Sequence, residues 1–297
     1  MRILVLDLLA ERSEFGHGGN IEMVKPFTEF HSELEVFLIT PQYEDLLKLK
    51  NIQLELIQID QGNVPYWDDE TVFNSIVYEN IDNSIVKFIR VLTPLGSVGE
   101  LSDWLKKNDI SCVFCSGSRR NVSQPEPWME PAKKILRGAI KAEIPVLGIC
   151  FGHQLLADAL GGEVIRSNHR TDAIYNLELS KLGLKDPLFD GLLNEGSGPV
   201  TLYTHQDHVV DIIGTESVKI ELLGSSKHCK NAAIRVSMEG KLLPVWGVQF
   251  HPEASLPRIE RSYKLGHISL EEKEKFNQEH DGAKILENFA SIVNLKT

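Results

Sequence analysis

The chain has 297 residues, of which 42% are hydrophobic and 25% are charged, a composition ordinary for a globular protein with a sizeable core. Its formal net charge of −11 argues against a broad nucleic-acid-binding face and against attachment to anionic lipid. Four cysteines are too few for a disulfide framework and no apolar run is long enough to span a bilayer, so we expect a cytoplasmic protein.

Predicted strands and helices alternate through the first part of the chain. Residues 2–8, RILVLDL, are predicted as a buried strand, followed by a helix near residues 21–30 and by strands at 34–40 and 54–59. The segment GHGG, residues 16–19, has the wrong glycine spacing for a nucleotide-binding loop and is predicted as an ordinary loop. Alternating strands and helices predict a mostly parallel central sheet with helices on both faces.

Apolar residues recur at broadly helical spacing farther along the chain and predict a helix-rich insertion around residues 71–107, with its last helix at 98–107. A strand follows, ISCVFC at residues 110–115, then a loop, SGSRRN, and a helix near residues 131–141. The two cysteines of this strand form a CxxC pair. Because residues three apart on a strand point to opposite faces, we do not expect them to share a metal ion.

The stretch GICFG, residues 148–152, lies between a predicted strand and a predicted helix at 152–160. G-x-C-x-G in this position is the cysteine version of a nucleophile elbow, in which a sharp turn raises the side chain above the carboxyl edge of the sheet. The helix N-terminus would favour the thiolate of Cys150, and the backbone N–H of Phe151 would point toward an oxyanion. A buried cysteine at a tight turn is the alternative, and this pentapeptide alone leaves both open.

The later half is predicted to consist mostly of strands and to end in helices. A capping box formed by Ser269 and Glu272 and an amphipathic run at 283–293 predict a C-terminal helical extension around residues 256–297. With no repeat or obvious linker, we expect one domain, residues 1–297. The strands are predicted at residues 163–165, 175–179, 200–203, 220–223, 232–236 and 244–250.

A base for Cys150 is suggested by the segment PVWGVQFHPEAS. His251 follows an apolar strand and should emerge at a sheet edge, where Pro252 disfavours helix. Glu253 is placed to accept a hydrogen bond from the imidazole and so to fix its tautomer. Together with GICFG this segment predicts a Cys-His-Glu catalytic triad.

GICFGHQLLADALGG followed by GVQFHPEAS resembles the class I (triad-type) glutamine amidotransferase family, and within it the GMP-synthase-like stand-alone amidotransferase domain. The resemblance extends from about residue 110 to the end of the chain and is weaker before it. It implies a flavodoxin-like α/β fold. It also implies that Cys150 attacks the γ-carbonyl of glutamine to form a thioester, that His251 protonates the departing ammonia and then activates water, and that Glu253 orients His251.

The resemblance also implies residues of the glutamine pocket. Gln154 matches a family glutamine that helps to hold the substrate. THQDHV resembles a Ser-His-Gly-Asp segment that lines the pocket, which makes His205 a pocket residue unless it lies in a surface loop.

One loop departs from the family pattern. Where members carry Gly-Gly-Pro and use the loop backbone as an oxyanion donor, this chain retains Gly117 but has Ser118 and Arg119. Either the loop presents its N–H differently or the oxyanion hole forms when a partner binds. Arg119 and Arg120 either hold an acidic group, such as the substrate α-carboxylate, or are solvated loop residues.

The overall prediction is a glutaminase-type subunit that binds L-glutamine and supplies ammonia to a separate synthase. Only 44 residues follow Glu253, too few for an ATP-using synthetase domain, and we expect no cofactor, metal, nucleic acid or membrane. A Glu-x-Gly that contributes to the glutamine pocket is missing from SNHRTDAIYNLEL, so a γ-glutamyl peptide hydrolase remains an alternative. A catalytically silent regulatory protein is the third possibility.

Overall fold

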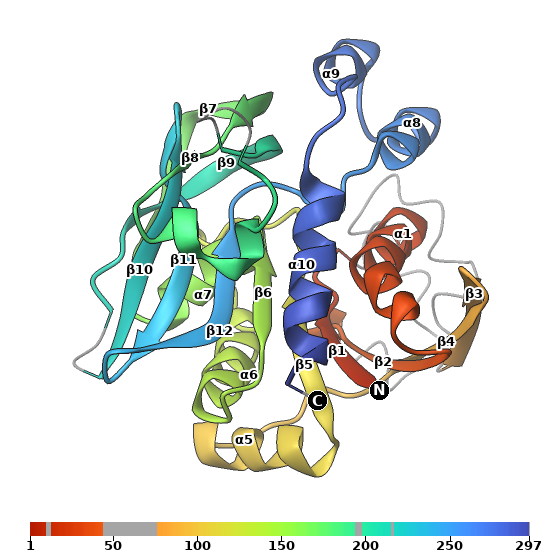
Figure 1. Ribbon diagram of the computed structural model, residues 1–297, viewed down its shortest axis with the longest axis vertical. Helices are drawn as coiled ribbons and strands as arrows, with labels where there is room; N and C mark the ends of the chain where they lie inside the picture. Colours follow the sequence, from red (N-terminus) through yellow and green to blue (C-terminus); the bar gives the residue numbers. More distant parts are fainter. Residues whose placement is uncertain (10–12, 44–75, 194–197, 215–216, 297) are drawn as a thin grey trace.

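The computed structural model describes residues 1–9, 13–43, 76–193, 198–214 and 217–296, so the strand predicted at 54–59 lies outside the described residues (Figure 1). Among the described residues, ten strands form one sheet in the order β3-β4-β2-β1-β5-β6-β12-β11-β10-β8. Neighbours are parallel from β4 to β12 and antiparallel at both sides of that block. The strands are β1 (Arg2–Leu6), β2 (Glu33–Ile39), β3 (Ile76–Ile81), β4 (Ser84–Arg90), β5 (Ile110–Cys115), β6 (Val146–Ile149), β8 (Glu178–Leu179), β10 (Val218–Ser226), β11 (Cys229–Met238) and β12 (Lys241–Val248).

Helices cover both faces of this sheet, which confirms the predicted α/β architecture with a mostly parallel centre. Ile3 and Val5 of β1 pack into one core with α1, η2 and α10, whereas Leu4 and Leu6 pack into a second core with α5, α6 and α7. The helices are α1 (Ser13–Val24), η2 (Lys25–Glu29), η3 (Pro41–Tyr43), α5 (Val98–Lys107), α6 (Met129–Lys141), α7 (Phe151–Ala159), η4 (Gly183–Lys185), η5 (Pro187–Phe189), α8 (Leu256–Lys264), α9 (Leu270–Lys275) and α10 (Gly282–Asn294).

The CxxC pair of β5 divides between the two cores, as the strand prediction requires. Cys112 lies in the core with α10 and Cys115 in the core with α6 and α7. Burial raises the pKa of both thiols. These two cysteines are therefore structural.

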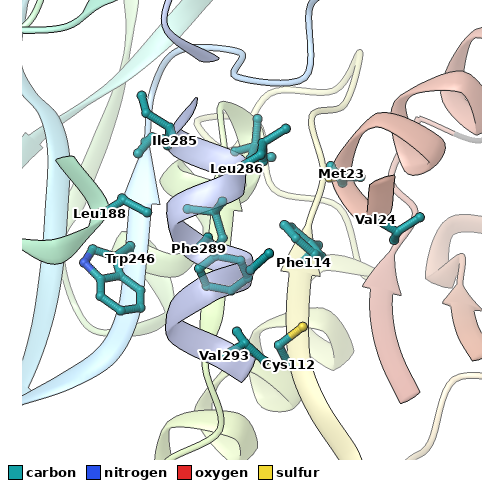
Figure 2. Packing of buried hydrophobic residues seen from close by; sticks show 14 of the residues in the cluster. Met23, Val24, Cys112, Phe114, Leu188, Trp246, Ile285, Leu286, Phe289 and Val293 are labelled. Atoms are coloured by element: carbon teal, nitrogen blue, oxygen red, sulfur yellow. The ribbon is translucent and has the colours of Figure 1, made fainter. Parts of the chain in front are cut away.

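The last helix, α10, lies at the centre of the first core (Figure 2). The ring of Phe289 meets Phe114 of β5 at a centroid distance of 5.1 Å and Trp246 of β12 at 6.0 Å, both edge to face. Edge-to-face packing of this kind stabilises aromatic clusters beyond the area they bury. The C-terminal helix therefore helps to hold β5 and β12, the two strands that flank β6 and precede the site described below.

The helical prediction for residues 76–90 is wrong, because this segment forms the β3–β4 hairpin. Asp82 and Asn83 have φ of 47° and 67°, and two consecutive positive values are what a two-residue hairpin turn needs. Burial alternates along β4, and β4 pairs in parallel with β2 inside the main sheet, so this segment is part of the sheet. The helix at 98–107 is confirmed as α5, with Ser97 and Glu100 forming a capping box.

Residues 16–19, predicted as a loop, lie inside α1. Glycine is a poor helix former in isolation, so local propensity did not indicate a helix here. The helix forms despite its glycines, and packing explains one of them. A Cβ on Gly19 would lie only 3.0 Å from Nη1 of Arg258. Gly19 therefore lies at a close contact between α1 and Arg258 of α8.

A second, two-stranded sheet joins β7 (Glu163–Asn176) and β9 (Val200–Asp211). Both strands are longer than predicted, and THQDHV lies within β9 and not in a loop after it. The C-terminal helices α8, α9 and α10 are confirmed, including the capping box of Ser269 and Glu272. No helix in the described ranges is both long enough and apolar enough to cross a membrane.

Candidate active site

Cys150 occupies a strained turn between β6 and α7. Its φ is 51° and its ψ is −101°, a backbone conformation that non-glycine residues rarely adopt. The turn is held by two backbone hydrogen bonds, from Cys150 N to Val248 O at 2.8 Å and from Gln154 N to Cys150 O at 3.1 Å. The predicted nucleophile elbow is therefore present, with the thiol at the carboxyl end of β6.

The two glycines around Cys150 are required by close backbone contacts. A Cβ on Gly148 would lie 2.6 Å from Gly152 O, and a Cβ on Gly152 would lie 2.0 Å from Cys115 O. No side chain fits at such distances. The close packing of α7 against β5 and β6 thus explains the two glycines of the G-x-C-x-G pattern.

His251 and Glu253 lie beside Cys150, at the end of β12. The backbone N–H of His251 donates to Leu202 O at 2.8 Å, and its Nδ1–H donates to Glu253 Oε1 at 2.8 Å. Nε2 of His251 is buried and has no hydrogen-bond partner among the described residues. It is therefore the ring nitrogen left to exchange a proton with Cys150 or with a substrate.

The charged forms of His251 and Glu253 stabilise each other. Burial by itself would lower the pKa of His251, but interactions with Cys150 and Glu253 outweigh it and raise that pKa well above its ordinary value. Burial would raise the pKa of Glu253, but His251 and then Arg258 lower it. The arrangement favours a charged imidazolium that is hydrogen-bonded to the Glu253 carboxylate and lies beside Cys150.

The SGSRR loop lies against the imidazole. A Cβ on Gly117 would come within 3.2 Å of Cε1 of His251, so steric contact explains this glycine. Among the described residues neither Gly117 nor Ser118 has a positive φ, and Arg120 N donates to Ser118 Oγ at 3.2 Å. The serine therefore closes the turn without a positive φ at the position where the expected pattern has its second glycine.

Phe151 is the first residue of α7, and its N–H has no acceptor within the helix. Its ring is buried and stacks on Trp128 at a centroid distance of 5.7 Å. The side chain is thus structural, while its backbone N–H is available beside the thiol. This geometry is compatible with the predicted oxyanion donor.

Gln154 lines the cavity, but its amide is engaged with the protein. Its Nε2 donates to Asp207 O at 2.7 Å and to Gln249 Oε1 at 3.1 Å. Gln249 Nε2 in turn donates to Cys150 Sγ at 3.6 Å. Gln249, which the sequence reasoning missed, touches the thiol directly, although it lies in the same GVQFHPE stretch as His251.

His205 is buried in β9 and is not part of a surface loop. Its Nδ1–H donates to Asp207 O at 2.8 Å, which leaves Nε2 to accept from Nε2 of His228 at 3.0 Å. Burial, followed by neighbouring histidines, lowers the pKa of His205 to about 3, and burial lowers the pKa of His228 to about 4. The pair is therefore neutral near pH 7. No sequence motif pointed to His228.

All of the predicted site residues line one cavity of about 380 Å³, together with α8, α9 and their connection. Five arginines also line it: Arg119 and Arg120 in the loop after β5, Arg166 and Arg170 on β7, and Arg258 on α8. Arg170 Nη2 donates to Thr204 Oγ1 at 2.6 Å, and Thr204 O lies 3.8 Å from Cys150 Sγ. The side chain of Arg170 is therefore one residue away from contact with Cys150. Within the described ranges, no three His, Cys, Asp or Glu residues are grouped as metal ligands.

Comparisons with known proteins agree with this geometry. The model of the family described as glutamine amidotransferase class-I matches residues 79–263. One subunit of the glutamine-hydrolyzing GMP synthase of Methanococcus aeolicus is 29% identical over 211 residues, which cover 70% of this chain and 85% of that protein. The corresponding subunit from Methanocaldococcus jannaschii is 35% identical over 129 residues, covering 43% of this chain and 61% of that protein, less than two thirds.

A solved structure, that of SMU.1228c, resembles the whole chain. It has a TM-score of 0.60 at 13% sequence identity, and the match covers 99% of this chain and 100% of that one. At this level of identity the likeness concerns the fold alone.

Proposed function

The chain belongs to the class-I glutamine amidotransferase family, and from that premise we propose that it hydrolyses the side-chain amide of glutamine with Cys150 as nucleophile, His251 as acid and base, and Glu253 as the residue that orients His251. One observation supports this assignment most strongly. The strained turn of Cys150 and the hydrogen-bonded pair of His251 and Glu253 lie at the same cavity, although a hundred residues separate the cysteine from the histidine.

The proposed reaction uses groups already described. The Cys150 thiolate attacks the γ-carbonyl carbon, and the resulting oxyanion accepts from the N–H of Phe151, with the backbone of Gly117 and Ser118 on the other side. The tetrahedral intermediate collapses, the C–N bond breaks, and the proton of imidazolium His251 goes to the departing ammonia. Neutral His251 then takes a proton from water, which hydrolyses the thioester to release glutamate.

A glutamine analogue with an electrophilic side chain tests the assignment of Cys150. We expect mass spectrometry to find one adduct, on Cys150, whose formation slows when free glutamine is added. Cys229, buried in the same core, serves as the internal control and should remain unlabelled. Labelling that ignores glutamine, or that falls on another residue, would contradict the proposed role.

We further propose that the ammonia passes to a separate synthase. The support is that the relatives from Methanococcus aeolicus and Methanocaldococcus jannaschii are themselves described as subunits of GMP synthase. Affinity purification from the source cell, followed by an assay of ammonia release with and without the recovered protein, checks this. A synthase that binds and raises the glutaminase rate is the expected result. If no such protein is recovered and the isolated chain hydrolyses glutamine at the full rate, the proposal is contradicted.

A second function, hydrolysis of γ-glutamyl peptides by the same thioester route, is favoured by one observation. Besides the buried Arg258, the cavity of about 380 Å³ is lined by four arginines, which suit a substrate that carries more carboxylates than glutamine does. Free glutamine and γ-glutamyl-glutamate offered side by side discriminate the two. A higher kcat/KM for the dipeptide would make the hydrolase the main activity, and a higher value for glutamine would exclude it.

A further inference from the structure

Arg258, on α8, is a buried arginine that none of the roles above uses. It is among the residues that line the cavity, and it is only 9% exposed. Nη1 donates to Glu253 O at 3.1 Å, and Nη2 donates to Phe15 O at 2.9 Å. The guanidinium also lies 4.4 Å from the centroid of the Phe15 ring, a cation–π contact. Arg258 thus joins the backbone of a triad residue to the N-terminal helix.

The face of α1 is shaped for this guanidinium. A Cβ on Gly19 would lie 3.0 Å from Nη1 and 3.1 Å from Nη2 of Arg258, whereas a Cβ on the neighbouring Gly18 would lie no closer than 3.9 Å, at Nε. Figure 1 shows α1 beside α8, and the two helices are in contact. Gly19 therefore leaves the space that the charged group fills, which accounts for the glycine at this position of the helix.

The charge of the buried Glu253 carboxylate needs a second positive neighbour, besides His251, to stabilise it. Its Oε1 accepts from His251, but its Oε2 is buried and has no hydrogen-bond partner in the described part of the chain. The charged groups around the carboxylate are His251 and Arg258. Glu22 of α1 faces Arg258 in turn, and its Oε1 accepts from Ser255 Oγ at 2.9 Å.

We propose that Arg258 is a positioning residue for the triad: seated between Phe15 and Gly19, it fixes the backbone of Glu253 and supplies the positive charge behind the Glu253 carboxylate. This inference rests on the proposed function. It makes α1, which lies outside the region matched by the family model, part of the support of the active site.

The first test replaces the charge. We expect Arg258→Met to lower kcat for glutamine by about 10- to 100-fold at unchanged KM, because the triad and not the substrate is disturbed. Removing a positive charge raises the pKa of Glu253, so the acid limb of the kcat profile should move to higher pH. Arg258→Lys should recover part of kcat. Lys264→Met, an exposed position of the same helix, should match the wild type.

The second test changes Gly19, which leaves space for the guanidinium, and keeps Arg258. Alanine favours helix over glycine, so Gly19→Ala and Gly18→Ala should both fold with α1 intact. Gly19→Ala should displace the guanidinium, lower kcat and move the acid limb in the same direction as Arg258→Met. Gly18→Ala, where the added methyl meets only ordinary contact, should keep the wild-type kcat. The two alanine variants test the role of Arg258 even if Arg258→Met does not fold.

Two results would overturn the inference: a folded Arg258→Met with the kcat and pH profile of the wild type, or equal kcat for the two alanine variants. Cys150→Ala separates these failures from a failure of the proposed function. If Cys150→Ala still releases ammonia, the catalytic assignment is wrong. If Cys150→Ala is inactive while Arg258→Met and Gly19→Ala behave like the wild type, only the role of Arg258 is wrong.

Discussion

In the proposed mechanism, Glu253 acts on Cys150 through the imidazole of His251, and this coupling is measurable. Its negative charge is one of the causes that raise the pKa of His251. Glu253→Gln keeps the shape of the side chain and removes that charge, so the pKa of His251 should fall. Because the imidazolium loses its proton as pH rises through that pKa, the alkaline limb of kcat/KM for glutamine should move to lower pH.

The pH profile of Glu253→Gln, measured beside that of the wild type, checks this expectation. Glu260→Gln, which changes a carboxylate exposed on α8, is the control and should leave the limb in place. An alkaline limb unchanged in Glu253→Gln would mean that the carboxylate orients His251 without any electrostatic effect on it.

At the residue scale, the sequence predicts the parts of the site that are local. Cys150 between its glycines and His251 two positions before Glu253 are short-range patterns, and the structure brings all three together. Gln249 reaches Cys150 across 99 positions and Arg258 reaches Phe15 across 243. Contacts of this kind depend on how distant strands and helices pack together, so no local sequence pattern reveals them.

The β3–β4 hairpin shows the same contrast at the scale of elements. Its apolar residues satisfy a helical spacing almost as well as an alternating one, and only pairing of β4 with β2 resolves the ambiguity. The capping box at the start of α5 is local, and the helix was predicted with its observed bounds. The β7–β9 ribbon was predicted only as short strands, because its length depends on cross-strand pairing.

The turn of this hairpin allows a direct test of its conformation. Asn83 has a φ of 67°, which a β-branched side chain tolerates poorly. Asn83→Val should therefore lower the free energy of unfolding by about 1–2 kcal/mol, as measured by chemical denaturation. Tyr78→Val, at an exposed strand position in β3, should change it little. Equal free energies of unfolding for the two variants would contradict the positive φ of Asn83 in this turn.

At the scale of the whole molecule, α10 ties the end of the chain to the strands that flank the site. The fold class was predictable because alternating strands and helices permit few sheet arrangements. The central position of α10 was not, because an amphipathic pattern shows that a helix packs without showing where. Phe289 meets Phe114 and Trp246 only once β5 and β12 lie in one sheet.

Truncating this aromatic side chain should destabilise the entire fold. Phe289→Ala is expected to lower the free energy of unfolding by about 3–5 kcal/mol, because it leaves a cavity between β5, β12 and α10. Leu295→Ala, at a residue 87% exposed just after the helix, is the control and should have an effect within about 0.5 kcal/mol. Equal unfolding midpoints in denaturant would show that α10 is peripheral.

The central claim is that Cys150 is the nucleophile that releases ammonia from a γ-glutamyl amide. The most direct measurement is the rate of ammonia release from glutamine by the wild type, by Cys150→Ala and by Cys112→Ala, with folding monitored by circular dichroism. We predict release by the wild type and by Cys112→Ala, and a loss of about 10⁶-fold in folded Cys150→Ala. Undiminished release by folded Cys150→Ala would contradict the account.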